Sequence, residues 1–335
     1  MKTKMKNCLY CYQPLEGNEI DFHQACSKKM FGTNVSPILD FNLKETEEIA
    51  KKLVIKSIAV TGVQPKLSLE LEKKLKEIPR LTIVGLHGDY IFKPQSQQFA
   101  ELPENEDLTM HLAELVKIKV AKHSLIRLKS GELGYITKRF DRNKGKKIAV
   151  EDFCQLSENL TEHKYRGSVE KIGKLVYQFT ANKGFESQRL FELVLFSFLI
   201  GNADMHLKNY SLIENALGEY EFSPAYDLLS TVLVIPDDNE ESALTINGKK
   251  NRIGLKDFNK LANSLNINEK SLQAIYSRFN KVLPKWKDFI NQSFLSDEMK
   301  THYTQLITHR FDTLFPKILK KTEMNWDRKN FKNPS

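Results

Sequence analysis

The stretch that decides the fold reads GNADMHLKNY over residues 201–210, and Tyr226-Asp227 follows it. The run LFELVLFSFLI at 190–200 is strongly apolar and predicts a buried helix directly before this stretch. A core element that ends abruptly in ionisable residues is a poor place for ordinary packing and a good place for a site. Residues 210–213 and 220–223 predict two short strands around Gly218, which would return Asp227 toward Asn209.

Three side chains of this stretch have the residue types and order of a phosphoryl-transfer site. In the loop pattern D-x-x-x-x-N of protein kinases, the Asp accepts the proton of the substrate hydroxyl, and the Asn and a later Asp hold magnesium. Asp204, Asn209 and Asp227 fit these roles in that order. Because Asp and Asn are also common turn residues, the spacing alone also fits an ordinary turn.

The composition is that of an ordinary water-soluble protein, with 335 residues, 41% hydrophobic and 28% charged. This length suits about two domains. The longest apolar run is shorter than the ~20 residues that span a bilayer. The basic start MKTKMKNCLY lacks the apolar segment of a secretory signal, so we expect a cytoplasmic protein. The net charge of +9 fits a nucleic-acid partner, an anionic substrate or a partner bound to nucleic acid, and a solvated basic surface fits it at least as well as a nucleic-acid face.

The four cysteines are too few for a disulfide framework, and three of them cluster near the N-terminus. Cys8 and Cys11 form a C-x-x-C pair, and His23 and Cys26 form an H-x-x-C pair twelve residues later. Three thiolates and one imidazole are a complete ligand set for a structural zinc ion. The alternatives are a redox pair, for which no strand–helix context is present, and a cysteine-containing turn without metal.

The hydrophobic pattern predicts an α+β chain with a β-rich part before a mostly helical part. We expect a Cys/His module over 1–35, a β-rich lobe over 45–142 and a helical lobe over 143–335. The first lobe should hold strands near 58–60, 66–71, 81–84, 90–93, 124–128 and 134–139, and a helix over 103–122. The last helices should span roughly 269–283, 286–294 and 297–311. A cleft between two lobes is a common place for a ligand.

Further candidate residues lie in the predicted first lobe. Gly62, between two predicted strands, lets the backbone turn and present N–H groups to an anion, although a plain hairpin turn is equally consistent. Lys93 ends a short apolar strand and can reach phosphates. Glu106 is one partner for Lys93, and Glu101 and Glu104 are equally available. At the lobe boundary, Asp141 is a candidate for a ribose hydroxyl.

In this order the pieces resemble the HipA family of serine/threonine protein kinases, the toxin partners of bacterial toxin–antitoxin pairs. The resemblance spans roughly residues 55–315 and is carried by 62–66, Lys93, 104–106, 139–142, 151–155, 201–209 and 226–230. It implies a two-lobed kinase-like fold that uses ATP and magnesium. Asp204 would be the proton acceptor, Asn209 and Asp227 the magnesium ligands, and Lys93 a catalytic phosphate contact.

The resemblance also implies a nucleotide-binding set and partners. With Asp141 and Asp227 added, that set is Thr61, Gly62, Val63, Gln64, Pro65, Lys66, Lys93, Lys138, Arg139, Phe140, His206, Leu207, Lys208, Asn209 and Tyr226. Family targets are aminoacyl-tRNA synthetases, and the antitoxin is a helix-turn-helix DNA-binding protein. We therefore expect DNA contact only through an antitoxin complex, and no membrane partner.

Two departures from the family pattern define further expectations. Full-length members have an extra N-terminal subdomain, whereas here the Cys/His segment stands before the loop, as in shortened toxins whose missing subdomain is a separate small protein. The position of the family's autophosphorylated serine is Ala59 here. Ser57 and Thr61 are therefore the candidate autophosphorylation sites; a loop without this control, or an engineered Ala59, are the alternatives.

Two other functions fit parts of the sequence. A small-molecule kinase on the same scaffold would use the same Asp–Asn–Asp set, because that set serves any hydroxyl acceptor. A non-enzymatic zinc-containing DNA-binding or antitoxin-type module would account for the Cys/His cluster and the positive charge. Magnesium-dependent ATP binding distinguishes the kinases from the module, and transfer of labelled phosphate to a single protein band distinguishes the two kinases.

Overall fold

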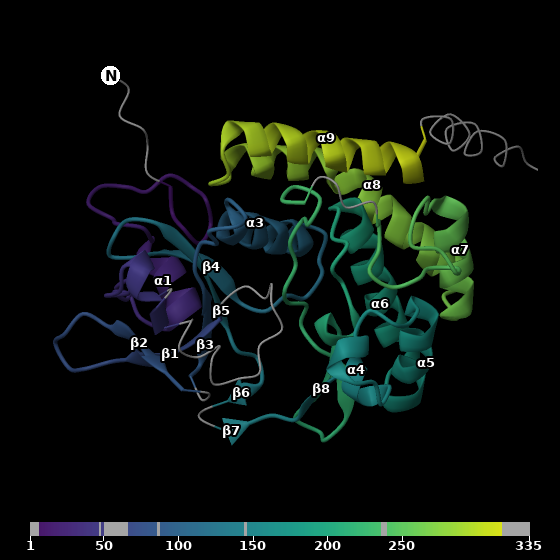
Figure 1. Ribbon diagram of the computed structural model, residues 1–335, viewed down its shortest axis with the longest axis horizontal. Coiled ribbons are helices and arrows are strands. Elements are labelled where there is room, and N and C mark those ends of the chain that lie inside the picture. Colours follow the sequence, from purple (N-terminus) through teal and green to yellow (C-terminus); the bar gives the residue numbers. More distant parts are fainter. Residues whose placement is uncertain are drawn as a thin grey trace, which may run out of the picture.

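The first lobe is built around a five-stranded antiparallel sheet with the strand order β2-β1-β3-β5-β4 (Figure 1). The computed structural model describes residues 7–46, 48–49, 66–85, 88–143, 146–235 and 240–316. The strands of this sheet are β1 (Leu67–Glu72), β2 (Arg80–Val84), β3 (Tyr90–Lys93), β4 (His123–Arg127) and β5 (Leu133–Lys138). Apolar side chains of β3 and β5 are buried in the core, and this packing fixes the position of Lys93 at the end of β3.

Helix α3 (Leu102–Leu115) packs on this sheet and is buried along most of its length. It is shorter than the predicted helix over 103–122, because Lys117 takes a left-handed backbone conformation with φ of 68° and the chain turns toward β4. Two helices of the other lobe also contact α3. Trp286 Nε1 donates to Leu112 O at 2.9 Å, and the hydroxyls of Tyr303 and Thr109 lie 2.8 Å apart.

The second lobe is mainly helical. Its helices are α4 (Phe153–Leu156), α5 (Val169–Phe179), α6 (Lys183–Leu199), α7 (Leu255–Ser264), α8 (Glu269–Gln292) and α9 (Asp297–Leu314), with short 3-10 turns at Thr161–His163 and Leu207–Asn209. Strands β8 (Val150–Asp152), β9 (Ser211–Glu214) and β10 (Tyr220–Phe222) form a small sheet. The hairpin predicted around Gly218 is therefore confirmed as β9 and β10.

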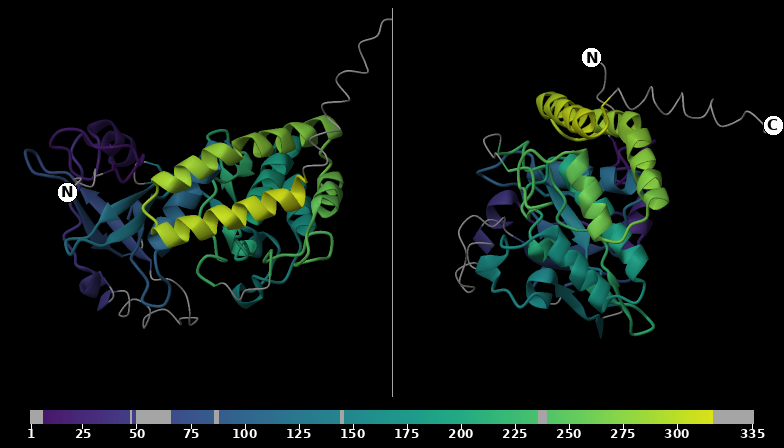
Figure 2. Two further views of the ribbon diagram at one scale, coloured as in Figure 1. Left: turned by 90° about the horizontal axis from the view of Figure 1, so that it is seen from above. Right: turned by 90° about the vertical axis from the view of Figure 1, so that its right-hand side faces the viewer.

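Helices α8 and α9 lie side by side and extend from the helical lobe across α3 (Figures 1 and 2). The expectation of two separate helices over 269–283 and 286–294 is wrong, because α8 continues through Pro284. The turn after it is fixed by Trp286, which is fully buried and bonded to α3. Tertiary packing therefore outweighs the local cost of a proline inside the helix.

A short N-terminal module packs against the first lobe. Helix α1 (Gln24–Phe31) ends at Gly32, whose left-handed conformation lets its N–H bond to Lys28 O. The rings of Phe31 and Tyr90 lie 5.9 Å apart, which seats α1 on β3. The lobe connection carries the small hairpin of β6 (Arg142–Asn143) and β7 (Lys146–Lys147). Among the described residues, no helix is both long and apolar enough to cross a membrane.

Candidate active site

Lys93 joins two carboxylates that come from different lobes. Its Nζ lies 2.6 and 2.7 Å from the two oxygens of Glu106 on α3 and also donates to Oδ1 of Asp227. Lys93 and Glu106 are buried, with 4% and 1% of their surfaces exposed. The pairing of Lys93 with Glu106 is therefore confirmed, while Glu104 instead accepts from Gln95 Nε2 at 2.8 Å.

A second lysine reaches the other oxygen of Asp227. Lys66, just before β1, places Nζ 3.3 Å from Asp227 Oδ2. The rest of the predicted phosphate loop (Thr61, Gly62, Val63, Gln64 and Pro65) lies outside the described residues, as do Ser57 and Ala59. Asp227 has a φ of 59°, a left-handed conformation that is uncommon for a residue with a side chain and is found often at functional sites.

The four charges shift one another's protonation. Burial alone would raise the pKa of Asp227, but Lys66 and Lys93 outweigh it and hold that pKa well below its usual range. Burial raises the pKa of Glu106 to about 7, and Lys93 offsets only part of this effect. Asp227 is therefore ionised at neutral pH, and Glu106 is poised to change charge near neutrality.

The loop 201–209 is held by its own backbone and by the segment after Asp227. Gly201 ends α6 with a φ of 70°, and Ala203 N donates to Thr231 Oγ1 at 2.8 Å. Asp204 N donates to Asn202 Oδ1 at 3.0 Å, and Asn209 Nδ2 donates to Asp204 O at 2.9 Å. Since Nδ2 of Asn209 is used within the loop, Oδ1 is the atom that can coordinate a cation.

Tyr226 brings Asp227 onto this loop. Its hydroxyl donates to Lys208 O at 2.8 Å and lies 2.5 Å from Ser211 Oγ. These contacts hold the residue before Asp227 against the segment that contains Asn209. Burial lowers the pKa of His206, and the nearby carboxylate of Asp204 offsets only part of this effect.

Two other residues of the loop, Leu207 and Lys208, contact the first part of the helical lobe. Lys208 Nζ donates to Asp152 Oδ2 at 2.8 Å, and Asp152 caps α4. The buried Leu207 donates its N–H to Lys164 O at 3.1 Å. These contacts fix the loop against the start of the helical lobe.

At the lobe boundary, the predicted nucleotide contacts are engaged with other groups. Arg139 donates to both oxygens of Asp141, at 2.9 and 2.7 Å, and Arg142 donates to Oδ2. The backbone N–H groups of Lys138 and Arg139 donate to Lys122 O and Asp89 O. The ring of Phe140 lies 5.6 Å from that of Tyr226. A ribose contact by Asp141 would therefore compete with two guanidinium groups.

Two residues that the sequence analysis did not assign have clear positions in the site. The amide of Asn105, next to Glu106, bonds to both N and O of Ser230, each at 2.9 Å, and so ties α3 to the segment after Asp227. Tyr165 donates its hydroxyl to Asp204 Oδ1 at 2.5 Å. A polar asparagine within a helix that packs in the core was a usable signal; the tyrosine, in an irregular loop, gave none.

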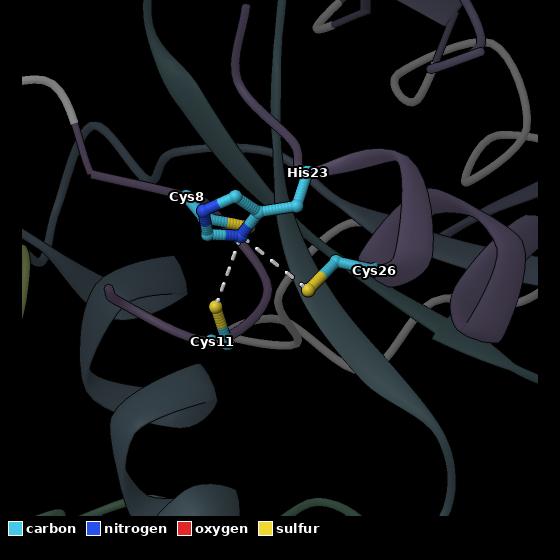
Figure 3. Close-up of side chains that lie close together, drawn as sticks. All are labelled: Cys8, Cys11, His23 and Cys26. Carbon is cyan, nitrogen blue, oxygen red and sulfur yellow. Dashed lines mark hydrogen bonds between the residues drawn. The ribbon is translucent and has the colours of Figure 1, made fainter. Parts of the chain in front are cut away.

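The four N-terminal candidates lie together in one cluster (Figure 3). Their ligand atoms are all within 4.8 Å of one another, and His23 Nδ1 lies 3.4 Å from Cys11 Sγ and 3.7 Å from Cys26 Sγ. His23 Nε2 lies 3.0 Å from Pro14 O, so Nδ1 is the nitrogen available to a metal. The Cys8 and Cys11 thiols share a hydrogen bond, which lowers the pKa of Cys8 and raises that of Cys11. The donor set fits a zinc ion.

The other cysteine lies apart from this cluster. Cys154 is buried at the start of α4, where its Sγ lies 3.3 Å from Asn159 O. Burial raises its pKa, which keeps the thiol neutral. This position agrees with the expectation of a small buried hydrophobe.

The family described as HipA-like C-terminal domain matches residues 58–286 of this chain. A protein of Sinorhizobium fredii named as a putative kinase is 34% identical over 209 residues, which are 59% of this chain and 50% of that protein. The serine/threonine-protein kinase toxin HipA of Shewanella oneidensis is 28% identical over 209 residues, 56% of this chain and 46% of the toxin. The chain thus matches about half the length of these relatives.

Two solved structures have a similar fold. The HipA of Shewanella oneidensis, in a complex with HipB and its operator DNA, matches with a TM-score of 0.63 and 22% identity, over 80% of this chain and 70% of that one. The proinflammatory kinase CtkA of Helicobacter pylori matches with a TM-score of 0.51 and 16% identity, over 74% and 94%. The expected two-lobed kinase-like fold is therefore confirmed.

Proposed function

The chain belongs to the family of HipA-like C-terminal domains, and from this premise we propose that it is an ATP-dependent serine/threonine protein kinase of the HipA type. The observation that carries the proposal is Lys93, which bonds to Glu106 on α3 and to Asp227 from the other lobe. In protein kinases, activity requires both a strand-lysine to helix-glutamate pair and a metal-binding aspartate. Here one lysine joins the two elements.

The catalytic roles follow from the position of each side chain. Asp204 accepts the proton of the acceptor hydroxyl. Its Oδ1 is accessible to a hydroxyl group, because the hydroxyl of Tyr165 donates to it in this structure. Asn209 Oδ1 and the Asp227 carboxylate would hold magnesium. Lys93 and Lys66 orient the phosphates and exchange part of their contact with Asp227 for them. Bound ATP with magnesium supplies the phosphoryl group and neutralises its charge.

We place the nucleotide between the lobes, against the residues that the sequence analysis selected. The proposed contacts are residues 61–66 and 138–141, which precede the helical lobe in the sequence, and residues 206–209 and 226–227 within it. We also propose three domains: the Cys/His module over 1–35, a β-rich lobe over 45–142 and a helical lobe over 143–335. In this proposal the Cys/His module holds a structural zinc ion. Ser57 or Thr61 would be the autophosphorylation site, since a phosphate there would repel the ATP phosphates.

The biological proposal is a cytoplasmic toxin of a toxin–antitoxin pair. The relative from Shewanella oneidensis is named a kinase toxin, and its structure includes HipB and operator DNA. By analogy, the proposed partners are a helix-turn-helix antitoxin and a separate small subdomain-like protein. The proposed substrate is an aminoacyl-tRNA synthetase, phosphorylated on a serine or threonine.

The test uses the full chain with labelled ATP, magnesium and a lysate of the source cells. Wild type should label one protein band, identified by mass spectrometry as a synthetase, and its expression should arrest growth. Asp204→Asn should lower transfer by ~10²–10⁴-fold and keep ATP binding, because only the proton acceptor is lost. The exposed Asp288→Asn is the matched control and should behave as wild type.

Other outcomes would reject parts of the proposal. Equal transfer by wild type and Asp204→Asn rejects the catalytic assignment. Label that appears only in small molecules rejects the protein substrate. If the peptides that cover residues 55–66 carry no phosphate after incubation with ATP, control by phosphorylation at Ser57 or Thr61 is rejected.

A further inference from the structure

A second cluster of ligand-type side chains lies on the face of α3 that adjoins the N-terminal module. Asp107 and His111 are one helical turn apart on α3, and His123 opens β4 opposite them. All three are buried, with 0%, 7% and 2% of their surfaces exposed. One ligand atom from each lies within 4.8 Å of the others. None of these residues takes part in the proposed transfer reaction.

One histidine nitrogen from each ring faces the Asp107 carboxylate. His123 Nδ1 lies 2.7 Å from Asp107 Oδ1, and His111 Nε2 lies 3.6 Å from Oδ2. The hydroxyl of Tyr12 donates to the same Oδ2 at 2.7 Å. The ligand atoms around a tetrahedral ion with bonds of ~2.0–2.1 Å are ~3.3 Å apart. The distances from the two histidine nitrogens to the Asp107 oxygens are close to this value, so small side-chain movements would let these groups bind a metal ion.

The opposite edges of both rings face a second carboxylate. Glu114 Oε2 lies 3.1 Å from His111 Nδ1 and 3.9 Å from His123 Nε2. Metal-binding histidines commonly donate their other ring N–H to a carboxylate, which orients the ring and makes the binding nitrogen more basic. Glu114 occupies that position for His111.

The tautomer of His111 leaves a buried lone pair without a partner. Because an ionised Glu114 only accepts, the proton of a neutral His111 is on Nδ1, and Nε2 then presents its lone pair to the Asp107 carboxylate. His111 Nε2 has no hydrogen-bond partner, and neither does His123 Nε2. Within the described part of the chain, no lysine or arginine lies within ion-pair distance of Asp107. A cation between the lone pair of His111 Nε2 and the Asp107 carboxylate oxygen, which lie 3.6 Å apart in the core, would stabilise both groups.

We propose that Asp107, His111 and His123 bind a divalent metal ion of the zinc class, with the Tyr12 hydroxyl beside it. Nitrogen and carboxylate ligands suit zinc and its neighbours among the transition metals. The ion is structural, because protein groups surround it and the site is buried. It joins three parts of the chain: the Cys/His module through Tyr12, the sheet through His123, and α3 next to Glu106.

The competing explanation is a proton in place of the metal. A doubly protonated His111 between Asp107 and Glu114 would also balance the charge. The two explanations differ in metal content, so a count of bound ions in the full chain separates them.

The experiment compares metal content after purification, mild chelation and dialysis against zinc. We expect His111→Gln/His123→Gln to bind one ion fewer per chain than wild type, by elemental analysis and native mass spectrometry. The exposed pair on α9 gives the matched control: His302→Gln/His309→Gln should bind as many ions as wild type. Equal metal content in wild type and His111→Gln/His123→Gln overturns the proposal.

A second measurement does not depend on whether the histidine variant folds, because its deciding sample is wild type. Wild type loaded with cobalt should bind one ion per chain that gives d–d absorption without thiolate charge-transfer bands, because no cysteine is in the Asp107 cluster. That ion should remain in Cys8→Ser/Cys26→Ser. If every bound cobalt ion in wild type shows the thiolate bands, the metal belongs to the Cys/His cluster alone and the second site is rejected.

Discussion

Neighbouring residues of α3, Glu106 and Asp107, are both buried carboxylates, yet their surroundings balance charge in different ways. Glu106 faces Lys93, whose other contact is Asp227, and Lys66 completes a set of two carboxylates and two lysines. Asp107 faces two histidines and a tyrosine. In the Glu106 cluster two lysines therefore balance two carboxylates, and the phosphates of a nucleotide can compete with Asp227 for these lysines. The Asp107 cluster has no lysine or arginine partner among the described residues, and in our proposal a removable metal ion balances its charge.

The largest expected effect comes from removing the fixed charge of the Glu106 cluster. Lys93→Met leaves Glu106 buried without its cation, and breaking such a pair costs ~3–5 kcal/mol. We expect phosphoryl transfer to fall by at least ~10²-fold and the free energy of unfolding to drop by an amount in that range. Urea denaturation and labelled-ATP transfer measure the two effects. As the control, the exposed Lys285→Met on α8 should change neither; unchanged stability of Lys93→Met would mean that the pair is not buried in solution.

The next effect is a pH dependence that belongs to Glu106 alone. Its pKa is raised from the model-peptide value of ~4.3 to about 7 in the folded state, chiefly by burial. The folded state therefore holds the proton more tightly, and this group costs stability as the pH rises from about 4.5 to about 7. Relative to Glu106→Gln, wild type should gain on the order of 1–3 kcal/mol as the pH falls through that window. A pH-independent difference between the two proteins, measured by urea denaturation, would contradict the pKa shift.

The order of the elements in the sequence predicted part of the Glu106 cluster and none of the Asp107 cluster. Lys93 ends a predicted strand and acidic residues open the next helix, so the order of the elements predicted a lysine–glutamate pair. It left Glu101, Glu104 and Glu106 equally available, and the structure selects Glu106. The cluster of Cys8, Cys11, His23 and Cys26 was also visible, because its ligands come in two short pairs.

The Asp107 cluster combines two positions inside a buried helix, the first residue of a strand and Tyr12. The apolar residues around Asp107 and His111 hide the pair, and no local pattern places Tyr12 on α3. The prediction that α8 ends before Pro284 was wrong for a similar reason. The proline interrupts the local pattern, but the buried Trp286 holds the helix in place. Contacts between distant elements were the part of the fold that the sequence did not reveal.

A smaller effect tests how the Asp107 cluster holds the N-terminal module. Tyr12→Phe keeps the stacked ring, which lies 5.0 Å from that of Phe289, and removes only the hydroxyl that bonds to Asp107. Loss of a hydrogen bond to a charged acceptor costs ~1.5–3 kcal/mol. We expect a stability loss in that range, with phosphoryl transfer at saturating ATP close to wild type. A large loss of transfer with little loss of stability would instead tie Tyr12 to the reaction.

The smallest effect should come from the exposed ion pair between the same module and β4. Arg127 Nε lies 3.0 Å from Asp21 Oδ1, but the two side chains are 42% and 22% exposed. Pairs of this kind contribute ~0–1 kcal/mol, because water and salt screen them. Arg127→Gln should therefore destabilise the chain less than Tyr12→Phe, and high salt should remove its effect while leaving that of Tyr12→Phe. If Arg127→Gln costs more, the module is held at its exposed edge, and Asp107 is not the anchor that binds it to α3.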